Sequence, residues 1–495
     1  MRTSSHPGGR FPAETPHTES RNTDFQSALC GLGLGLALLA MLTPNRAMAA
    51  DNGPVRFTVD PMPEPVPALR YTLLDEKIDQ TPGNAALAYQ RVTRMLASDK
   101  TWSEQKDQCR DWLELPLDQF PPEDLRKLLA GQENNLDQLV KATRFEQCDW
   151  EIPVREEGFS ALLPHLSEMR DVARLLSLQI RVLVHDGHYD EAMARLRAGM
   201  TLARHVAQGE LLIEGLVGVA VANTMLDRVQ EMISQPGAPN LYWALTDLPP
   251  GYLNAWQSTR WERSCVYVEF PVLRDPTGQP VTPGDLRRAI HDLQNIGGPQ
   301  LGWLPENEEQ SVMVAGLALV AYPKAREQLI AGGRSPEEVD RMPVSQALAV
   351  YLGEAYAIQR DNLFKWFALP FPQARKGMQQ AEEDLRTAAI NDPIGCLLPR
   401  LLLPALTRVQ ERFVELDRRI AALRCVEALR AFGAASNRRL PTSLSDAGLL
   451  PIPQDPVTGA AFEYELNNGV ARIEGVKISD GNRPGALSYE ITLRP

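Results

Sequence analysis

The sequence predicts a mainly α-helical protein, an irregular helical array that ends in one long helix and a small antiparallel sheet. Two observations support this fold class. Through most of the chain, apolar residues recur in alternating steps of three and four, the spacing that gives a helix one apolar face. Near the C-terminus the pattern changes to strict alternation around a turn, which is typical of strands.

Length and composition are those of a globular protein with more than one core. The chain has 495 residues, of which 44% are hydrophobic and 23% are charged. Such a chain can hold two or three domains, and disorder is not expected beyond its ends. The formal net charge of −12 argues against a protein that binds the nucleic-acid backbone.

Residues 1–49 are predicted to be a signal peptide that is cleaved after Ala49. A polar segment with basic residues precedes an apolar run of 15 residues at 28–42, and small residues follow before the cleavage site. A membrane span needs about 20 residues, so the run is short for an anchor. We therefore expect a periplasmic or secreted protein. The alternative is a protein that residues 28–42 anchor to the membrane, and only then would it contact a membrane.

The rest of the chain divides where its composition changes. A Pro-rich segment, 50–68, is predicted to be a linker or an extended edge. An N-terminal helical domain is expected over 69–250 and a less regular second helical region over 251–403. The long helix and the sheet occupy 404–495.

The core is expected in three consecutive helices between Ala161 and Ser234. Asp186-Gly187 and Gln208-Gly209 are predicted to end the first two helices, because Gly tolerates the backbone conformation found after a helix. The third helix is apolar on nearly every side, so it should be buried by the others. The apolar face of the first helix consists of Leu162, Leu166, Met169, Ala173, Leu176, Ile180 and Leu183.

Several other elements have recognisable starts. Thr81 as N-cap and Pro82 at the first position predict the beginning of a helix that runs through 85–96. The run Ser335-Pro336-Glu337-Glu338 is a further helix start. A single helix is expected over 256–273, and the longest helix over 404–432.

At the C-terminal end, Asn467-Asn468-Gly469 predicts the turn of a β-hairpin. Before it, Phe462, Tyr464 and Leu466 alternate with polar residues, as in a strand with one buried face. Residues 486–493 should supply a third strand. We expect this antiparallel sheet to pack on the preceding long helix.

Five motifs together resemble a family of uncharacterised exported helical proteins of planctomycete-type bacteria. They are Thr81-Pro82-Gly83-Asn84-Ala85-Ala86, Cys148-Asp149-Trp150, Leu163-Pro164-His165-Leu166, Ala203-Arg204-His205 and Leu241-Tyr242-Trp243-Ala244-Leu245. The resemblance covers about 67–250 and the C-terminal helix and sheet. It implies an architecture but no known activity.

Two shorter segments resemble other families. Residues 176–203, which include Gly187-His188-Tyr189-Asp190-Glu191-Ala192, are similar to one tetratricopeptide hairpin. Residues 440–466 resemble the sheet region of major pseudopilins, through a Leu-Pro opening and the run that begins at Asp455-Pro456. The pilin N-terminal helix and its cleavage pattern are absent, so filament assembly is not implied.

After signal cleavage the chain would keep an odd number of cysteines, and none has the CxxC spacing of a metal or redox site. We predict a disulfide between Cys109 and Cys148, because both lie near a Trp at segment ends and export permits oxidation. The alternative is that each thiol is an ordinary buried contact.

A few polar residues are candidates for metal binding. His185, His188 and Asp190 lie near one predicted turn and are weak candidates for metal ligands. The favoured interpretation is a polar turn, so no metal and no cofactor are expected. Asp455 and Asp480 could bind calcium, although turn formation explains them at least as well.

No residue is predicted to be catalytic. Glu262 and Glu269 are seven apart on one predicted helix and could form an acid/base pair, but an exposed charged face is the favoured interpretation. His165 and His205 are expected to cap helices or to form hydrogen bonds in the core.

The sequence favours an exported helical scaffold that binds a protein or peptide partner in the cell envelope. Two alternatives stand beside it. One is a metal- or carboxylate-dependent hydrolase with a cleft between the helical halves, and the other is an accessory of a pseudopilin-like envelope assembly.

Overall fold

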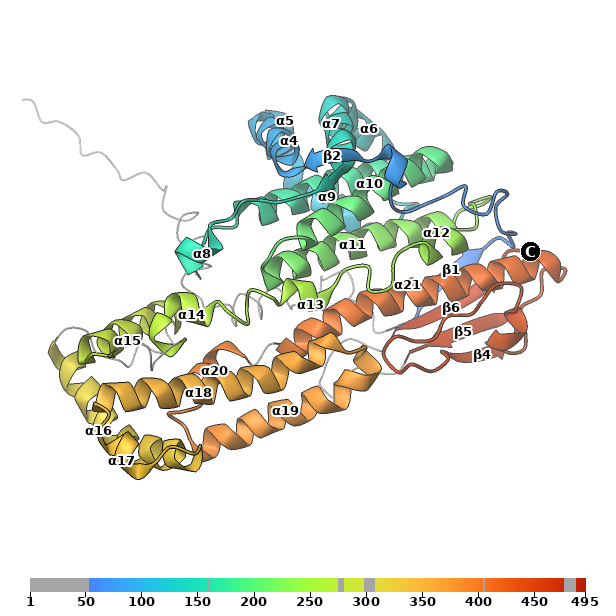
Figure 1. Cartoon of the computed structure of the whole chain (residues 1–495). Helices are drawn as coiled ribbons and strands as arrows, with labels where there is room; N and C mark the ends of the chain where they lie inside the picture. The colour runs from blue at the N-terminus through green and yellow to red at the C-terminus, as the bar shows by residue number, and fades with distance from the viewer. Residues whose placement is uncertain (1–52, 159–160, 275–279, 298–307, 404–405, 476–486) are drawn as a thin grey trace, which may run out of the picture.

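The computed structural model describes residues 53–158, 161–274, 280–297, 308–403, 406–475 and 487–495. Within these ranges the chain is mainly helical, with a small sheet near the C-terminus, which confirms the predicted fold class (Figure 1). Helices α4–α7 lie over the central helices, helices α15–α19 form one end of the molecule, and the sheet lies beside the long helix α21 (Figure 1).

Three central helices form the core, as the apolar spacing predicted, except that Leu162 precedes α9 and is 62% exposed. They are α9 (Pro164–His185), α10 (Tyr189–Ala207) and α11 (Leu212–Ile233), and each contacts the other two. Helix α11 is the one whose apolar residues point in nearly every direction, and it is mostly buried. The prediction that the other helices enclose it is confirmed.

The N-terminal helices pack on this core. They are α4 (Ala86–Ser98), α5 (Lys100–Glu114), α6 (Pro122–Ala130), α7 (Glu133–Thr143) and the short α8 (Val154–Glu157), with a 3-10 turn η1 (Lys77–Asp79) before them. Helix α5 was not predicted. Its buried side chains are only Trp102, Cys109 and Trp112, so its apolar pattern is sparse.

The predicted helix start at Thr81-Pro82 is wrong. Residues Thr81–Asn84 form strand β2, which pairs in parallel with β3 (Phe145–Gln147), and Ala85 precedes the helix instead. A residue before Pro is sterically biased towards extended backbone. Here the Thr81 N–H donates to the carbonyl of Arg144, so the distant strand decides the outcome.

The predicted helix over 256–273 is also wrong, because the segment contains three short pieces. They are α13 (Ala255–Ser258), α14 (Val266–Glu269) and η3 (Pro271–Leu273), and they follow α12 (Tyr242–Thr246). The other helices of this region are α15 (Pro283–Gly297), α16 (Glu308–Ala331), α17 (Pro336–Asp340), α18 (Val344–Phe364), η5 (Lys365–Ala368), α19 (Phe371–Asn391) and α20 (Leu397–Leu402). The Ser335 side chain caps α17 by accepting from the Glu338 N–H, as predicted.

The C-terminal module contains the longest helix, α21 (Leu406–Ala435), and contains η6 (Leu444–Ala447) and strands β4 (Glu463–Asn467), β5 (Val470–Glu474) and β6 (Ser488–Leu493). The predicted hairpin turn is confirmed, and it has two residues, because Asn467 pairs with Val470 and Asn468 and Gly469 between them both have positive φ. Helix α21 contacts β6, as expected of a sheet that packs on this helix.

A fourth strand completes the sheet. Strand β1 (Val55–Val59) lies within the Pro-rich segment predicted to be a linker or an extended edge, and it pairs in parallel with β6 at the edge of the sheet, which confirms the second alternative. The sheet is therefore mixed, with strand order β1-β6-β5-β4, and not purely antiparallel. Phe57 and Val59 are buried while Arg56 and Thr58 are exposed, which is the alternation of a half-buried strand.

A buried ion pair on α21 connects this helix to the end of β1 and to the segment before α12. Arg430 on α21 pairs with Glu427 at 2.9 Å, and it also donates to the carbonyls of Asp60, Ala238 and Pro239. The guanidinium thus holds together the end of β1, the segment before α12 and α21.

Candidate functional site

A group of buried polar side chains lies at the N-terminal end of α11. We name it the α11 cluster and define it as Trp150, His165, Glu214 and Glu262, all of which are buried. Trp150 follows β3, His165 lies in the first turn of α9, Glu214 in the first turn of α11, and Glu262 between α13 and α14. The cluster therefore joins the predicted N-terminal domain to the second helical region.

Two carboxyl groups bind the first backbone N–H groups of this part of the chain. Leu211 N donates to Glu214 Oε2 at 2.9 Å, and Leu212 N donates to Glu262 Oε1 at 2.5 Å. The first N–H groups of a helix have no partner within the helix and need acceptors from elsewhere. The two carboxyl groups thus accept hydrogen bonds from buried backbone N–H groups at the start of α11.

Histidine and tryptophan complete the cluster. His165 Nε2 donates to Glu214 Oε1 at 3.0 Å, and the ring of Trp150 stacks on the imidazole with centroids 4.6 Å apart. Gly209, in the turn before α11, gives the carboxyl group room, since a Cβ there would lie 2.0 Å from Glu214 Cδ. The glycine predicted to end a helix therefore also admits a buried side chain.

Burial shifts the proton equilibria of this region. Burial raises the pKa of Glu262 to about 8, so this carboxyl group holds a proton at neutral pH. Next to the cluster, Tyr89 Oη lies 2.8 Å from His205 Nδ1, and burial lowers the pKa of His205 to about 3. The expectation that His165 and His205 form hydrogen bonds in the core is confirmed.

The acid/base pair of Glu262 and Glu269, the less favoured interpretation, is not found. Glu262 binds the start of α11, whereas the Glu269 carboxyl group lies against Gly158, where a Cβ would be 2.0 Å from its Oε1. The favoured interpretation of an exposed charged face is wrong for Glu262, which is buried. Two carboxyl groups and a histidine are acid/base groups in principle. In this cluster they bind backbone and each other, which stabilises the packing of the core.

Two of the three metal candidates, Asp190 and His185, have other partners. Asp190 accepts from Tyr71 Oη at 2.7 Å and from Arg70 at 3.0 Å, and these contacts lower the pKa of its carboxyl group. His185 Nδ1 lies 2.9 Å from Asp186 Oδ1, and His188 is exposed just before α10. In the described ranges, no three residues of metal-binding type come together.

The predicted disulfide is not present, since Cys109 and Cys148 are both buried free thiols. They lie near opposite ends of α9. Cys148 lies near Glu214, and Glu214 contacts His165 at the start of α9. Cys109 lies one turn before Trp112, and the Trp112 carbonyl accepts a hydrogen bond from Arg181 near the end of α9. His165 and Arg181 are separated by roughly 24 Å along a helix of this pitch. A disulfide needs Cα atoms within about 7 Å.

Asp455 has a structural role. Its carboxylate pairs with Arg418 on α21 through two hydrogen bonds of 3.0 and 2.7 Å, and it accepts from the Val457 N–H. The carboxylate thus joins the loop before β4 to the long helix. The other calcium candidate, Asp480, lies outside the described residues.

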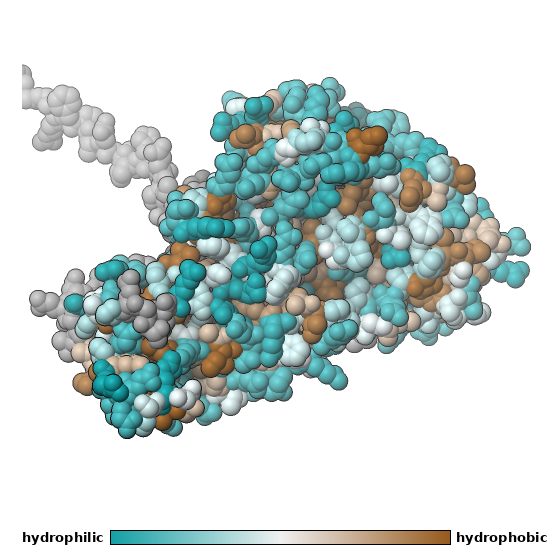
Figure 2. All heavy atoms as spheres, viewed as in Figure 1, coloured by the Kyte–Doolittle hydropathy of each residue, from teal (hydrophilic) through white to brown (hydrophobic). Residues whose placement is uncertain are grey.

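One surface feature was missed by the sequence prediction. We name it the α16 stripe and define it as the exposed residues Ala315, Gly316, Leu319, Val320 and Pro323. Leu319 is 74% exposed and Val320 is 70% exposed. Residues 311–323 contain no charged residue and are apolar on all sides of the helix, which was the signal available in the sequence. Figure 2 shows apolar patches among polar surface over this end of the molecule.

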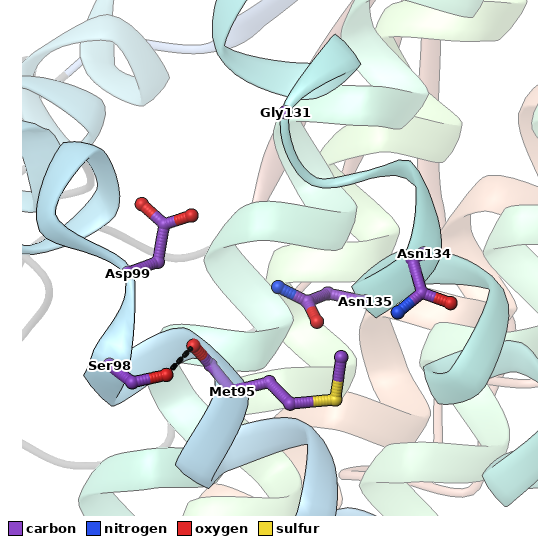
Figure 3. Close-up of a pocket in the computed structure, with 6 residues that line it drawn as sticks. All are labelled: Met95, Ser98, Asp99, Gly131, Asn134 and Asn135. Carbon is purple, nitrogen blue, oxygen red and sulfur yellow. Dashed lines mark hydrogen bonds between the residues drawn. The ribbon is translucent and has the colours of Figure 1, made fainter.

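A second surface feature is a hollow of about 360 Å³ between the end of α4 and the start of α7 (Figure 3). We name it the α4–α7 hollow. It is lined by Met95, Ser98, Asp99, Gly131, Asn134 and Asn135. The sequence contained no signal for it, because its two sides are more than 30 residues apart and meet only through packing.

Comparisons of the chain with models of protein families, with curated proteins and with solved structures find no match. The resemblances to the exported helical family, to the tetratricopeptide hairpin and to the pseudopilin sheet therefore stay predictions. Among the helices of the described ranges, none is both long enough and apolar enough to cross a membrane.

Proposed function

We propose that the protein is an exported helical binding protein of the cell envelope, and that it docks a helix of a partner protein on the α16 stripe. The observation that carries the proposal is the exposure of the stripe, where two large aliphatic side chains lie next to each other in the uncharged part of α16, residues 311–323. Contiguous exposed apolar surface of this kind is typical of interaction sites.

The spacing of the stripe fits a flat docking face. Its members follow the steps i, i+1, i+4, i+5 and i+8, which place them along one side of a helix. The opposite side of α16 is fixed to the protein, because Ala321, Ala325 and Leu329 are buried in a small core with α18. Arg326 also pairs with Asp340 of α17 at 2.6 Å. The stripe is therefore presented on a rigid element.

The shape of the stripe favours a helix as the occupant. Gly316 has open space in front of it, since a Cβ there would meet no atom within 4 Å. A gap beside Leu319 and Val320 lets the ridge of another helix approach closely. Because the chain carries a net charge of −12, an anionic lipid surface would be repelled.

A pair of variants tests this proposal. Leu319→Glu/Val320→Glu places charge on the stripe, and Gln328→Glu adds charge at an exposed position on another side of the same helix. Proteins that co-purify from envelope extract are quantified for the wild type and for both variants. We expect a partner that the stripe variant loses and the control retains, and whose isolated helix binds the wild type directly. An unchanged set of partners would refute the proposal.

Other occupants of the stripe give different results. If the wild type is a dimer by light scattering and the stripe variant is a monomer, then the occupant is a second copy and the partner-helix proposal is wrong. Binding to neutral vesicles that the stripe variant loses would likewise identify lipid as the occupant. Thermal unfolding checks that both variants remain folded.

The hydrolase and the pseudopilin-assembly accessory are the alternative proposals. Stoichiometric zinc or iron in the purified protein would favour the hydrolase, since a scaffold does not need a metal. Co-purification of pseudopilins that depends on residues 440–466 would favour the accessory.

A further inference from the structure

We propose that the α4–α7 hollow binds a protonated primary amine on an aliphatic stem, such as a lysine side chain or a free alkylamine. This inference is independent of the α16 stripe, because it involves different helices and different chemistry. The central observation is that Asn135 lines the hollow and that its Oδ1 is buried beside the hollow without a hydrogen-bond partner. Asn135 as a whole is only 7% exposed.

A chain of hydrogen bonds determines the orientation of Asn135. The Asp99 carboxylate can only accept, so the group that faces its Oδ2 at 2.9 Å must be the Gln132 amide nitrogen. Gln132 Oε1 then faces Asn135 and must accept from Asn135 Nδ2 at 2.6 Å. The Asn135 oxygen is therefore the atom left without a donor.

Two other side chains of the hollow, Ser98 and Asp99, also offer acceptors, whereas the Asn134 amide offers both a donor and an acceptor. Ser98 Oγ donates its proton to the Met95 carbonyl at 2.9 Å, so only its lone pairs are free. Asp99 Oδ1 accepts from the Trp102 N–H, and each carboxylate oxygen keeps a further lone pair. Within the described residues, no basic side chain pairs with Asp99. A ligand must therefore bring several donors, and positive charge is favoured.

The Asp99 carboxylate indicates that the ligand is a cation and not an anion. The N-terminal ends of α5 and α7 lie at the hollow and would by themselves attract an anion. The first of these ends is already capped by Asp99. An anion would also be repelled by the Asp99 charge and by the Asn135 oxygen, so we assign a cation.

The apolar side chain of the hollow, Met95, indicates which kind of molecule carries the positive charge. The Met95 side chain is exposed, and it extends towards Asn135 across the hollow (Figure 3). A flexible thioether packs well against methylene groups. An ammonium group has three donors, which matches Asp99, Asn135 and Ser98.

The test uses the full exported chain and saturation-transfer NMR with Nα-acetyl-lysine amide. The matched ligand is Nα-acetyl-norleucine amide, which has the same stem without the ammonium group. We expect saturable binding of the lysine compound and at least tenfold weaker binding of the norleucine compound. Equal binding of the two would overturn the proposal.

Variants locate the site. Asp99→Asn keeps a good N-cap for α5 but removes the charge, and Asn135→Leu removes the acceptor at similar size. Both should weaken lysine binding about tenfold or more, whereas Asp107→Asn on the exposed side of α5 should not change it. Unchanged binding in Asp99→Asn and Asn135→Leu, both verified as folded, would refute the site. Competition by inorganic phosphate for the lysine compound would show an anion site instead.

The source of the amine is tested separately. n-Butylamine and a lysine-containing peptide carry the same ammonium chemistry. Tighter binding of the peptide would assign a protein lysine, and equal affinity would assign free amines. This experiment does not depend on the α16 stripe, so its failure leaves the proposed function untouched.

Discussion

Glu262 Oε1 lies 2.5 Å from the backbone nitrogen of Leu212, although the two residues are 50 positions apart in the chain. The contact joins the segment between α13 and α14 to the start of the central helix α11. The pH dependence of folding should report this contact.

We expect Glu262→Gln to remove part of the alkaline loss of stability. The ordinary pKa of a glutamate is 4.5 and that of folded Glu262 is about 8. Between these pH values the folded protein holds a proton that the unfolded chain has released, so stability falls as pH rises from about 4.5 to 8. At pH 8 the variant should be more stable by a few kcal/mol, on the order of 1.4 kcal/mol for each pKa unit.

Urea unfolding between pH 5 and pH 9 measures this effect. The control is Glu463→Gln on strand β4, where the side chain is exposed. If the unfolding free energy of Glu262→Gln falls with pH as steeply as that of the wild type, then Glu262 is not buried in its protonated form.

His205 should make the opposite contribution at acid pH. Its ordinary pKa is 6.5, and burial lowers the folded value to about 3. Below about pH 6.5 the unfolded chain takes up a proton that the folded protein excludes, so stability falls as pH falls towards 3. His205→Asn should be less stable at pH 7, by about 1–3 kcal/mol, because packing and a buried hydrogen bond change.

The informative quantity for His205→Asn is the loss of unfolding free energy between pH 6.5 and pH 4. We expect a smaller loss than in the wild type. His188→Asn, at an exposed position, should leave that loss as it is in the wild type. A variant curve parallel to the wild-type curve would disprove the assignment to His205.

Leu176 and His188 test the core and the turn of the central hairpin. Leu176 is fully buried in α9, so Leu176→Ala should cost about 2–5 kcal/mol of unfolding free energy. His188→Ala should cost almost nothing, since its side chain is exposed. Thermal and urea unfolding measure both. A large loss for His188→Ala, together with loss of a bound metal, would revive the metal site at this turn.

Two neighbouring residues of β1 test whether this segment is a strand of the sheet or a linker. Phe57 is buried against Tyr489 with ring centroids 5.0 Å apart, so Phe57→Ala should cost about 3–5 kcal/mol. Arg56 is exposed and makes one surface ion pair with Glu490 at 3.2 Å, so Arg56→Ala should cost about 1 kcal/mol or less. Equal and small effects of the two substitutions would favour the linker.

The central helices and the hairpin show how much of the fold could be predicted. The periodic apolar residues of α9 and the glycines after α9 and α10 placed three helices correctly, and Asn468-Gly469 placed the turn. The candidate sites could not be found in the same way. The Asn135 oxygen is unpaired only because Gln132 also binds Asp99. The spacing of these residues in the sequence does not reveal this contact.

The sequence by itself determined the features that depend on a few adjacent residues: helical periodicity, the Ser335 cap, the hairpin turn and a mainly helical class. These follow from backbone sterics and from side chains within one or two turns. Tertiary structure decided the role of β1, the extended backbone at Thr81 and the burial of Glu262. In each case the free energy comes from a partner far along the chain, such as β6, β3 or α11. The local conformational preference of these residues is smaller than that contribution, so their conformation and burial depend on the folded structure.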